Sequence, residues 1–475
     1  MSLLKPVQCT GCPFEKTSKF FVPDEYRPGA SVLLTFQNPG QDEELGRKYL
    51  WRDSVGFPMY EPHPPAPLLG PTGYLLESKY LPLAGLARED VSLANVIRCR
   101  PNGKNDLPLV THLTYRQAVA HCQHHYFRPP ESTTLIVAAG DYALHAMTGE
   151  DGTESPGHKI SRSVEGWRGW LLPYNPHPLP KMTFTDIYQP RLGQVSVLAT
   201  FHIAYLWKAP WYEPCVNRDW AMVREILEGR WPVPFPRILE SPVTTWPDLS
   251  AYDTEFYVKA DGTSVLTRYS LRSKDGLWVV EAGDALGIAP KVGKVTPTVI
   301  FHNTEADARH LNDLLGGSEI FVEDSMHLHS VLYNDLDHDL DFLGSMHGSH
   351  NRTKHLLYSN PRVYSGGDAT MTWDAWHDMQ RSLARDPQSK RVYYDFQLPL
   401  IPIIARATLT GAKVNTERVK QALEALSSRQ KETIDRAQAS VGWPMNLNST
   451  KYLLHRLYEV EKIHLNKMTG REIKE

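Results

Sequence analysis

Short apolar runs, separated by longer polar stretches, organise the first half of the chain. The runs typical of buried strands are Ser31–Phe36, Val91–Ile97, Thr133–Ala139 and Gln194–Thr200. Helix-like stretches fall between them, and this alternation predicts an α/β layer fold with a mostly parallel sheet. In such folds the binding site gathers at the carboxyl ends of the strands. Pro39, Asn95 and His202 all fall at or near such ends.

A proline-rich stretch divides the chain after this first region. Asn217–Arg230 is helix-like, with Trp220, Val223 and Leu227 spaced for one apolar face. The helix is followed by Trp231-Pro232-Val233-Pro234-Phe235-Pro236. Proline at alternate positions gives a stiff, extended linker. The sequence therefore predicts a first domain over residues 1–230 and a linker over residues 231–237.

The pattern after the linker predicts a second α/β domain, over residues 238–390. Its strand-like runs are Asp253–Lys259, Thr263–Tyr269, Leu277–Val280, Thr298–Phe301 and Glu319–Val322. A helix is expected to begin near Asn303, a favourable cap, and to carry Asp307 one turn further along. Tyr364 and Asp368 are spaced as neighbours on one face of a later helix. Two glycines between them weaken that helix by about 1 kcal/mol each relative to alanine.

Two carboxylates lie two residues apart inside the first of these runs. Side chains alternate across a strand, so Asp253 and Glu255 point to the same face. Adjacent carboxylates repel each other unless a positive group lies between them, usually a divalent metal ion with oxygen ligands. Asp42 and Glu44 have the same spacing, so the pair alone is a weak signal. The acids downstream make it specific, because a solvated acidic face would not explain their apolar surroundings.

Length and composition indicate a multidomain globular protein. The chain has 475 residues, of which 41% are hydrophobic and 22% charged. The formal net charge of −3 does not by itself indicate a nucleic-acid partner, so DNA binding must rest on local basic patches. No apolar run approaches the roughly 20 residues of a membrane span, and the N-terminus has no signal-peptide pattern. We therefore expect a cytoplasmic protein without a membrane partner.

The five cysteines suggest four metal ligands and one bystander. An odd number in an intracellular chain argues against a disulfide framework. Cys9 and Cys12 form a Cys-x-x-Cys pair, which presents two thiolates to one soft metal centre. Cys99 and Cys122 are the later single cysteines that complete a set of four. The plainer alternative for the first pair is two buried thiols.

Several motifs occur in order over residues 5–228: Cys9-Thr10-Gly11-Cys12-Pro13, Asn38-Pro39-Gly40-Gln41-Asp42-Glu43, Gly70-Pro71-Thr72-Gly73-Tyr74-Leu75-Leu76, Asn95-Val96-Ile97-Arg98-Cys99-Arg100-Pro101, Cys122 and Thr200-Phe201-His202-Ile203-Ala204-Tyr205-Leu206. In this order and spacing they resemble the iron–sulfur uracil-DNA glycosylases. The resemblance implies an α/β/α parallel-sheet fold. It also implies that Cys9, Cys12, Cys99 and Cys122 hold a structural [4Fe–4S] cluster, with zinc as the competing occupant.

The same resemblance implies a base pocket, from which this chain departs at two positions. Asn95 would hydrogen-bond the edge of a flipped uracil, and His202 would steady the charge on the leaving base. Gln37 replaces an acidic residue of the family, and Leu68 replaces its stacking phenylalanine. A base–aromatic stack is worth about 1–3 kcal/mol, and glutamine cannot act as a base. An aromatic-rich insert over Tyr49–Ala66 is placed to close over or replace the pocket. We expect a DNA-binding or base-sensing module, with uracil excision as the alternative.

Three motifs with carboxylates follow the linker in order: Asp253-x-Glu255, Asn303-x-x-x-Asp307 and Tyr364-x-x-x-Asp368. Together they resemble the proofreading 3′–5′ exonuclease domain of family A DNA polymerases, which has an RNase H-like fold. The resemblance implies that the four acids, Asp253, Glu255, Asp307 and Asp368, hold two Mg²⁺ or Mn²⁺ ions roughly 4 Å apart. Tyr364 would orient the attacking water. The implied substrate is a DNA 3′ end, single-stranded or on a primer–template.

The last segment contains Gln397–Ile403, Thr410–Asn415, a long helical stretch Thr416–Ala439, and Asn446–Lys451. These stretches resemble the opening of the polymerase domain of the same family, reaching into its thumb over residues 391–475. No palm or fingers follow Lys467–Arg471, so we expect no polymerisation by this chain alone. It is expected to be a truncation, or one half of a split polymerase that needs a partner chain carrying palm and fingers.

The sequence thus predicts an α/β multidomain protein with a glycosylase-like domain, an RNase H-like exonuclease domain and a helical C-terminal segment. It resembles the N-terminal part of a phage-type replicative family A DNA polymerase, which would act in the cytoplasm of a bacterial host. Two alternatives stay open. One is a repair enzyme that excises uracil, and the other is a non-catalytic scaffold subunit of a split polymerase.

Overall fold

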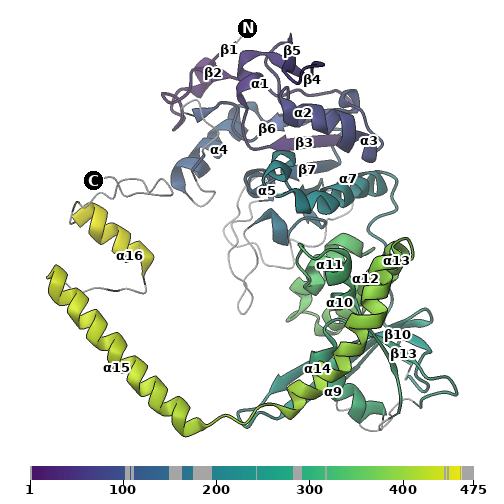
Figure 1. The fold of residues 1–475 in the computed structure, drawn as a ribbon. Helices are drawn as coiled ribbons and strands as arrows, with labels where there is room; N and C mark the ends of the chain where they lie inside the picture. The colour runs from purple at the N-terminus through teal and green to yellow at the C-terminus, as the bar shows by residue number, and fades with distance from the viewer. Residues whose placement is uncertain are drawn as a thin grey trace. The chain divides into compact units, whose positions relative to one another are not determined.

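The computed structural model describes residues 3–101, 107–108, 112–148, 163–174, 195–241, 243–281, 291–315, 318–442, 446, 449–460 and 462. The chain divides into two compact units, Met1–Ala405 and Arg406–Glu475. The first unit holds two five-stranded sheets covered by helices (Figure 1), in agreement with the predicted α/β class. Among the described helices, none combines the length and the apolar character that crossing a membrane requires.

The first sheet is built from the apolar runs of the first half of the chain. Its strands are β3 (Val32–Phe36), β6 (Val91–Asn95), β7 (Leu135–Ala139), β8 (Leu171–Pro173) and β9 (Ser196–Thr200). Their order is β6-β3-β7-β9-β8, and only β8 runs antiparallel to its neighbour. Every residue of β3, β6 and β7 is buried, as a parallel sheet with both faces covered requires. Gln194, the predicted start of β9, lies outside the described residues.

Helices cover this sheet and share its core. They are α1 (Gln41–Leu45), α2 (Pro71–Leu75), α3 (Leu81–Leu83), α4 (Leu113–Tyr126), α5 (Asp141–Thr148) and α7 (Glu213–Leu227). Large buried side chains such as Phe36, Trp167 and Trp220 fill the core. Phe36 pairs with Asn95 in the register of β3 and β6, so the carboxyl ends of these two strands lie side by side.

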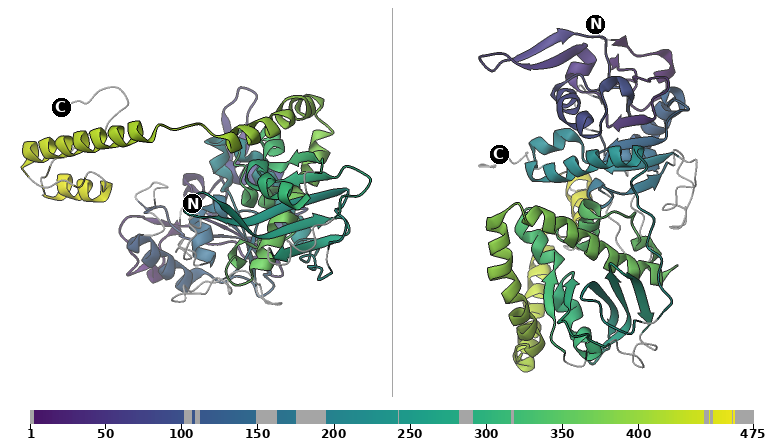
Figure 2. Two further views of the ribbon diagram at one scale, coloured as in Figure 1. Left: turned by 90° about the horizontal axis from the view of Figure 1, so that it is seen from below. Right: turned by 90° about the vertical axis from the view of Figure 1, so that its right-hand side faces the viewer.

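Two small antiparallel ribbons complete the first half. One pairs β1 (Leu3–Leu4) with β2 (Phe20–Phe21), and the other pairs β4 (Arg47–Arg52) with β5 (Pro58–Pro62). The β4–β5 hairpin is formed by the aromatic-rich insert and projects from its surroundings in the right-hand view of Figure 2. Its register shifts between Tyr49 and Trp51, which marks a β-bulge.

The second sheet combines an antiparallel and a parallel part. Its strands are β10 (Leu249–Val258), β11 (Ser264–Ser273), β12 (Gly276–Glu281), β13 (Thr298–Phe301) and β14 (Phe321–Asp324). The order is β12-β11-β10-β13-β14, with β10, β13 and β14 parallel. β10 begins four residues before the predicted Asp253, because Leu249–Ala251 pair in parallel with β13. β14 begins two residues later than the predicted Glu319.

The helices of this region are α9 (Thr304–Leu315), α10 (Ser325–Leu332), α11 (Leu340–His347), α12 (Pro361–Leu383), α13 (Pro387–Arg391) and α14 (Leu398–Thr410). α12 runs unbroken through Gly366 and Gly367. A Cβ at Gly367 would lie 2.0 Å from Oγ1 of Thr353, and one at Gly366 would lie 3.1 Å from the Leu277 side chain. The glycines therefore allow close packing, which offsets their weak helix propensity.

The two sheets of the first unit are joined by direct contacts. Leu336, Phe342 and Met346, from the region of the second sheet, belong to the core cluster of the first. The side chain of Asn351 forms two hydrogen bonds with the backbone of Leu171. It accepts one from the Leu171 N–H and donates one to the Leu171 carbonyl, each at 3.2 Å. The boundaries proposed at residues 230, 237 and 390 remain a prediction, because this unit spans all of them.

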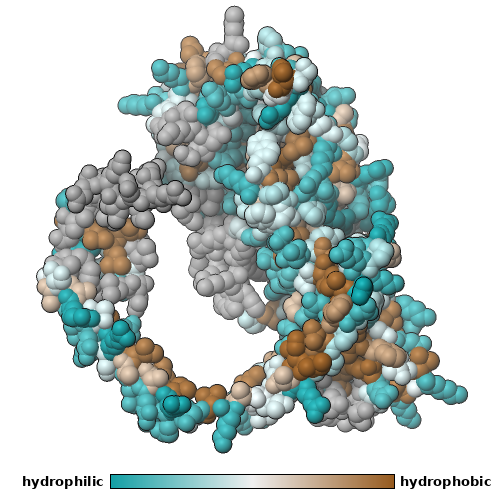
Figure 3. Space-filling view, in the orientation of Figure 1, coloured by the Kyte–Doolittle hydropathy of each residue, from teal (hydrophilic) through white to brown (hydrophobic). Residues whose placement is uncertain are grey.

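The second unit contains the predicted long helix. It is α15 (Thr416–Val441), followed by α16 (Thr450–Leu454). Oδ1 of Asn415 accepts the N–H of Arg418 at its start, and Gly442 ends it with a φ of 74°. Hydrophobic side chains lie on the surface of α15 (Figure 3), among them Val419, Leu423 and Leu426. Leu447, Asn448 and Lys467–Arg471, cited above as sequence landmarks, lie outside the described residues.

Candidate functional site

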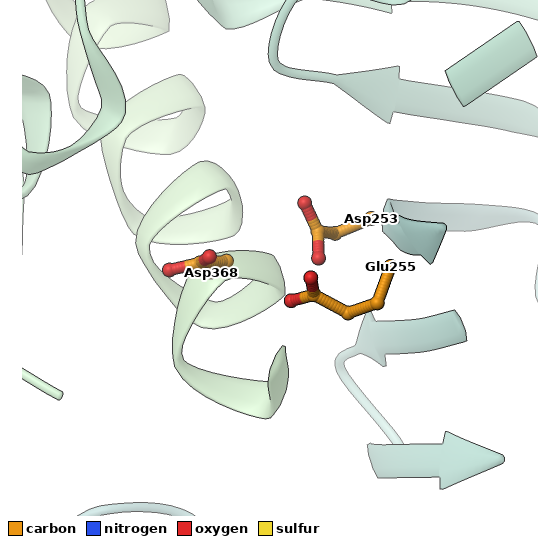
Figure 4. Close-up of side chains that lie close together, drawn as sticks. All are labelled: Asp253, Glu255 and Asp368. Carbon is orange, nitrogen blue, oxygen red and sulfur yellow. The ribbon is translucent and has the colours of Figure 1, made fainter. Parts of the chain in front are cut away.

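Three carboxylates from one strand and one helix meet in the first unit. Asp253 and Glu255 leave β10, and Asp368 leaves α12, which packs against β10 (Figure 4). One oxygen of each lies within 4.8 Å of the other two, and all three residues are half-buried. Oδ2 of Asp253 is buried and has no hydrogen-bond partner among the described residues. Three converging carboxylates with an unpaired buried oxygen are a ligand set suited to Mg²⁺ or Mn²⁺.

Burial and mutual repulsion raise the pKa of these carboxyl groups. For Asp253, burial has the largest effect, followed by the charges of Asp368, Asp307 and Glu255. Burial likewise raises the pKa of Asp368 to about 8 and that of Glu255 above its ordinary value. Like charges held this close favour bound protons or a bound cation, and a cation would displace the protons.

Asp307 lies beside this trio rather than within it. It is in the first turn of α9, only 5% exposed, and the hydroxyl of Thr254 donates a hydrogen bond to its Oδ1. Burial raises the pKa of Asp307 to about 7. Among the described residues, its carboxylate is not part of the group whose oxygens lie mutually within 4.8 Å. Asn303 precedes α9 with a φ of 66°, a left-handed conformation that asparagine tolerates.

Tyr364 precedes Asp368 by one turn of α12. Its phenol lies close enough to the Asp368 carboxylate to lower the pKa of that acid, against the larger effect of burial. Burial, and then the charges of Asp368 and Glu255, raise the pKa of Tyr364 above its usual range. The phenol therefore keeps its proton at neutral pH and can act as a hydrogen-bond donor at the edge of the carboxylate group.

Two charged residues that the motifs did not single out also border the site. Asp341, in the first turn of α11, pairs with Arg352 at 2.5 Å and with Lys354 at 3.3 Å. The charge of Asp341 raises the pKa of Asp368, and that of Lys354 lowers it. Thr353 lies against Gly367, which is next to Asp368 in α12. This contact places the neighbouring Lys354, and Asp341 that pairs with it, near the site. No local spacing connects these residues to Asp368, so only the tertiary fold reveals them.

The four predicted ligand cysteines come together from distant parts of the first half. Cys9, Cys12, Cys99 and Cys122 are 5–8% exposed. Burial raises the pKa of Cys99 to about 12, and the nearby thiols of Cys122, Cys12 and Cys9 contribute to that rise. Sγ of Cys9 lies 3.2 Å from the hydroxyl of Tyr126. The fifth cysteine, Cys215, is buried in α7.

The spacing of the sulfur atoms bears on what the cysteines could hold. A Zn–S bond of about 2.3 Å places tetrahedral sulfurs roughly 4 Å apart. Within the described residues, no three of these sulfurs lie mutually within 4.8 Å. The sulfurs as placed do not form a zinc-sized group, and the [4Fe–4S] cluster that the resemblance implies stays a prediction.

Cysteine substitutions test the cluster that the resemblance implies. We expect the purified protein to be brown, with broad visible absorption and about four irons per chain. Cys99→Ser should lose most of the colour and iron, because one of four thiolate ligands is removed. Cys215→Ser, a buried cysteine on α7, is the matched control and should keep both. One zinc per chain with a colourless protein would contradict the cluster assignment.

The residues predicted to contact a base lie at the carboxyl ends of the first sheet. Gln37 follows β3, Asn95 ends β6, and His202 follows β9. Asn95 is 2% exposed, and its Nδ2 is buried without a hydrogen-bond partner among the described residues. Burial lowers the pKa of His202 to about 4, so the ring is neutral at physiological pH. Its Nδ1 accepts the Ala204 N–H at 3.2 Å, which leaves Nε2 to carry the proton and donate it.

Leu68, at the position of the family's stacking aromatic, is buried and held in a strained conformation. Its φ is 57°, uncommon for leucine, and it is 4% exposed. The buried carboxylate of Glu43 accepts N–H groups from Leu68 at 2.8 Å and from Gly40 at 2.6 Å. Burial raises the pKa of Glu43 to about 7. Glu43 thus ties the Asn38-Pro39-Gly40 loop to Leu68, a role that its place in a run of acids did not reveal.

Comparison with known proteins relates the chain to two kinds of DNA enzyme. No family model matches it. It is 30% identical to the type-4 uracil-DNA glycosylase of Archaeoglobus fulgidus over 140 residues, which are 29% of this chain and 57% of that protein. For the type-4 uracil-DNA glycosylase of Thermotoga maritima the identity is 25% over 202 residues, 42% of this chain and 78% of that protein. A uracil-DNA-glycosylase-like region is therefore present in the chain.

The polymerase relationship covers a shorter stretch. DNA polymerase I of Chloroflexus aurantiacus is 29% identical over 90 residues, 19% of this chain and only 10% of that protein. The solved structure of Brucella melitensis NrnC bound to pGG matches with a TM-score of 0.30 and 19% identity, covering 37% of this chain and 94% of that one. A superposition this loose carries no argument about the site.

Proposed function

We propose that the chain is a DNA-processing enzyme that removes nucleotides from DNA 3′ ends by metal-dependent hydrolysis. The observation that carries this proposal is the convergence of Asp253, Glu255 and Asp368 within 4.8 Å, with Asp307 beside them. The partial likeness to a DNA polymerase I favours DNA as the substrate. The order β12-β11-β10-β13-β14 agrees with the RNase H-like arrangement expected of such a nuclease.

Each residue has a defined role in this proposal. Asp253, Glu255, Asp368 and Asp307 would hold two divalent cations, which supply charge stabilisation and a more acidic water. Tyr364, kept protonated by its surroundings, would donate a hydrogen bond that orients this water toward the phosphorus. Asp307 would be held in place by the hydroxyl of Thr254. The leaving group is the 3′ oxygen of the preceding nucleotide, so the product is a mononucleotide 5′-phosphate.

The test is digestion of a 5′-labelled single-stranded oligonucleotide with Mg²⁺ or Mn²⁺. A ladder that shortens from the 3′ end and stops in EDTA is expected. A substrate that stays at full length would favour the alternative of a non-catalytic scaffold. A partner chain with palm and fingers is a further part of the proposal. Its presence is tested by co-purification with a defined polymerase subunit.

A second function is proposed for the glycosylase-like region, namely recognition of an extruded uracil. The unpartnered Nδ2 of Asn95 and the neutral, donating Nε2 of His202 suit the carbonyl groups of a uracil edge. Gln37 lacks the carboxylate of the related enzymes, and Leu68 cannot stack as an aromatic ring does. The region is therefore proposed to bind uracil rather than to excise it.

Uracil binding and excision give separable results. In EDTA, we expect an oligonucleotide with one uracil to bind about 5-fold more tightly than its cytosine counterpart, which has an amine in place of the uracil O4, and Asn95→Ala to remove the difference, because one or two hydrogen bonds of about 1 kcal/mol are lost. Fluorescence anisotropy measures this. Alkali treatment should cleave neither strand. Cleavage at the uracil would instead establish the repair-enzyme alternative, and equal affinities would contradict uracil recognition.

A further inference from the structure

The β4–β5 hairpin exposes more hydrophobic surface than a solvated ribbon normally does. Large apolar or aromatic side chains on it are 37–78% exposed: Leu50, Trp51, Val55, Phe57, Met59 and Tyr60. The hairpin projects from its surroundings (Figure 2, right). A concentration of exposed apolar groups on one element marks an interaction surface.

The backbone of the hairpin is shaped to present Trp51. The β-bulge between Tyr49 and Trp51 leaves Trp51 with a φ of 113°, a strained conformation for an aromatic residue. Its ring stacks on Tyr74 at 5.1 Å with an interplanar angle of 20°, yet the residue stays 53% exposed. This backbone conformation of Trp51 therefore goes with an indole ring that is stacked on one side and open to solvent on its outer part.

The hairpin is anchored to the loops of the predicted base site. The backbone N–H of Tyr49 donates to the carbonyl of Leu69 at 2.8 Å, and His63 donates to Gly46 at 2.9 Å. Lys48 pairs with Glu77 at 3.0 Å. In sequence, the hairpin joins the Asn38-Pro39-Gly40 loop to Leu68. A single DNA strand bound at the base site would therefore pass beside the hairpin.

Charge separates the classes of partner that this surface could take. Arg52, at the end of β4, is exposed, donates to the Gly56 carbonyl at 3.3 Å, and pairs with no carboxylate among the described residues. Asp53 is engaged within the turn, where its Oδ1 accepts the N–H groups of Val55 and Phe57. Open aromatic faces beside an available guanidinium suit the bases and phosphates of single-stranded nucleic acid.

We propose that the β4–β5 hairpin is a stacking platform for single-stranded DNA that flanks the base site. Trp51 and Phe57 stack on bases next to the extruded one, and Arg52 contacts a phosphate. The platform replaces in part the stacking lost at Leu68. This proposal rests on DNA being the ligand of the chain, as proposed above, but it requires neither nuclease nor glycosylase activity.

The experiment is fluorescence anisotropy of a labelled oligo-dT 20-mer with the full chain in EDTA. Phe57→Ala and Trp51→Gly are each expected to weaken binding roughly 5-fold or more, the loss of one base stack. Glycine is chosen at position 51 because it tolerates the φ of 113°. Arg52→Ala should lower the slope of log affinity against log salt by about 0.7, the value for one phosphate contact on a single strand.

Phe321→Ala is the matched control, because Phe321 is 63% exposed and Phe57 69%, but Phe321 begins β14 in the second sheet. Its affinity should match wild type. Unchanged affinity in both Phe57→Ala and Trp51→Gly would overturn the proposal and leave the hairpin as a protein-docking surface. Equal losses on a blunt duplex would overturn it too, since stacked bases there are closed to the platform. Mononucleotide release in Mg²⁺, assayed on the same variants, reports separately on the proposed nuclease.

Discussion

Asp253→Asn is expected to slow release of 3′-terminal nucleotides by at least about 100-fold. Loss of a residue that only orients a metal ligand lowers activity less than this. The carboxylate converges with Glu255 and Asp368 within 4.8 Å and has an unpaired, buried Oδ2. Asparagine keeps the shape but removes the charge and one anionic ligand oxygen. Initial rates on a 5′-labelled oligonucleotide, measured over a range of Mn²⁺ concentrations, would show the loss.

The same substitution should not destabilise the metal-free fold. The folded-state pKa of Asp253 is raised above its ordinary value. A carboxyl with a raised pKa favours the fold while protonated, and this advantage is lost as pH rises from the unfolded toward the folded pKa. At neutral pH the native aspartate is therefore a net cost, which asparagine removes. We expect the melting temperature in EDTA at pH 7 to be unchanged or higher, while activity is lost.

Asp261→Asn is the matched control. Asp261 lies in the turn between β10 and β11, on the same pair of strands, where its Oδ1 accepts the Thr263 N–H. The nuclease rate of the Asp261→Asn variant should stay within about twofold of wild type. If Asp253→Asn kept wild-type activity, or if it lost activity only by unfolding, the assignment of the metal site would be wrong.

The sequence predicted the strands better than their ends. Unbroken apolar runs locate β3, β6 and β7, because a strand buried on both faces has little freedom in composition. The sequence pattern does not predict the start of β10 at Leu249, since this start depends on parallel pairing with β13, a non-local contact. Helix propensity predicts only that the glycines weaken α12, whereas the packed structure shows that the close approach of Thr353 to Gly367 requires a glycine there.

The candidate site divides in the same way. Fixed spacings along one strand or helix predicted the pairs Asp253–Glu255 and Tyr364–Asp368, because local geometry determines which residues share a face. Whether Asp307 belongs to the carboxylate group depends on distances between carboxylate oxygens, which no sequence spacing provides. Asp341 and Lys354 are not predictable from sequence spacing for a related reason, because their influence on Asp368 depends on how the segment before α12 packs.

Arg168→Leu is expected to lower the free energy of unfolding by about 3–5 kcal/mol, the cost of leaving a buried charge without its partner. Arg168 is fully buried, and its guanidinium donates to both oxygens of Asp219, at 2.7 and 3.2 Å. A further donor reaches Oγ of Ser345 in α11 at 2.7 Å, and the guanidinium lies over the ring of Phe342. One side chain thus joins the region of the first sheet to that of the second.

Chemical denaturation with tryptophan fluorescence measures this effect. Arg224→Leu is the matched control, because Arg224 forms a largely exposed pair with Glu228 on α7, and we expect a change of about 0.5 kcal/mol or less. Ser345→Ala removes the Arg168–Ser345 hydrogen bond together with the bond from Oγ of Ser345 to the Phe342 carbonyl, and should cost about 1–2 kcal/mol. Because the shared core also links the regions, the wild-type first unit should unfold in one transition. Two transitions in the wild type, or a loss below 1 kcal/mol in Arg168→Leu, would show that Arg168 does not couple the two sheets.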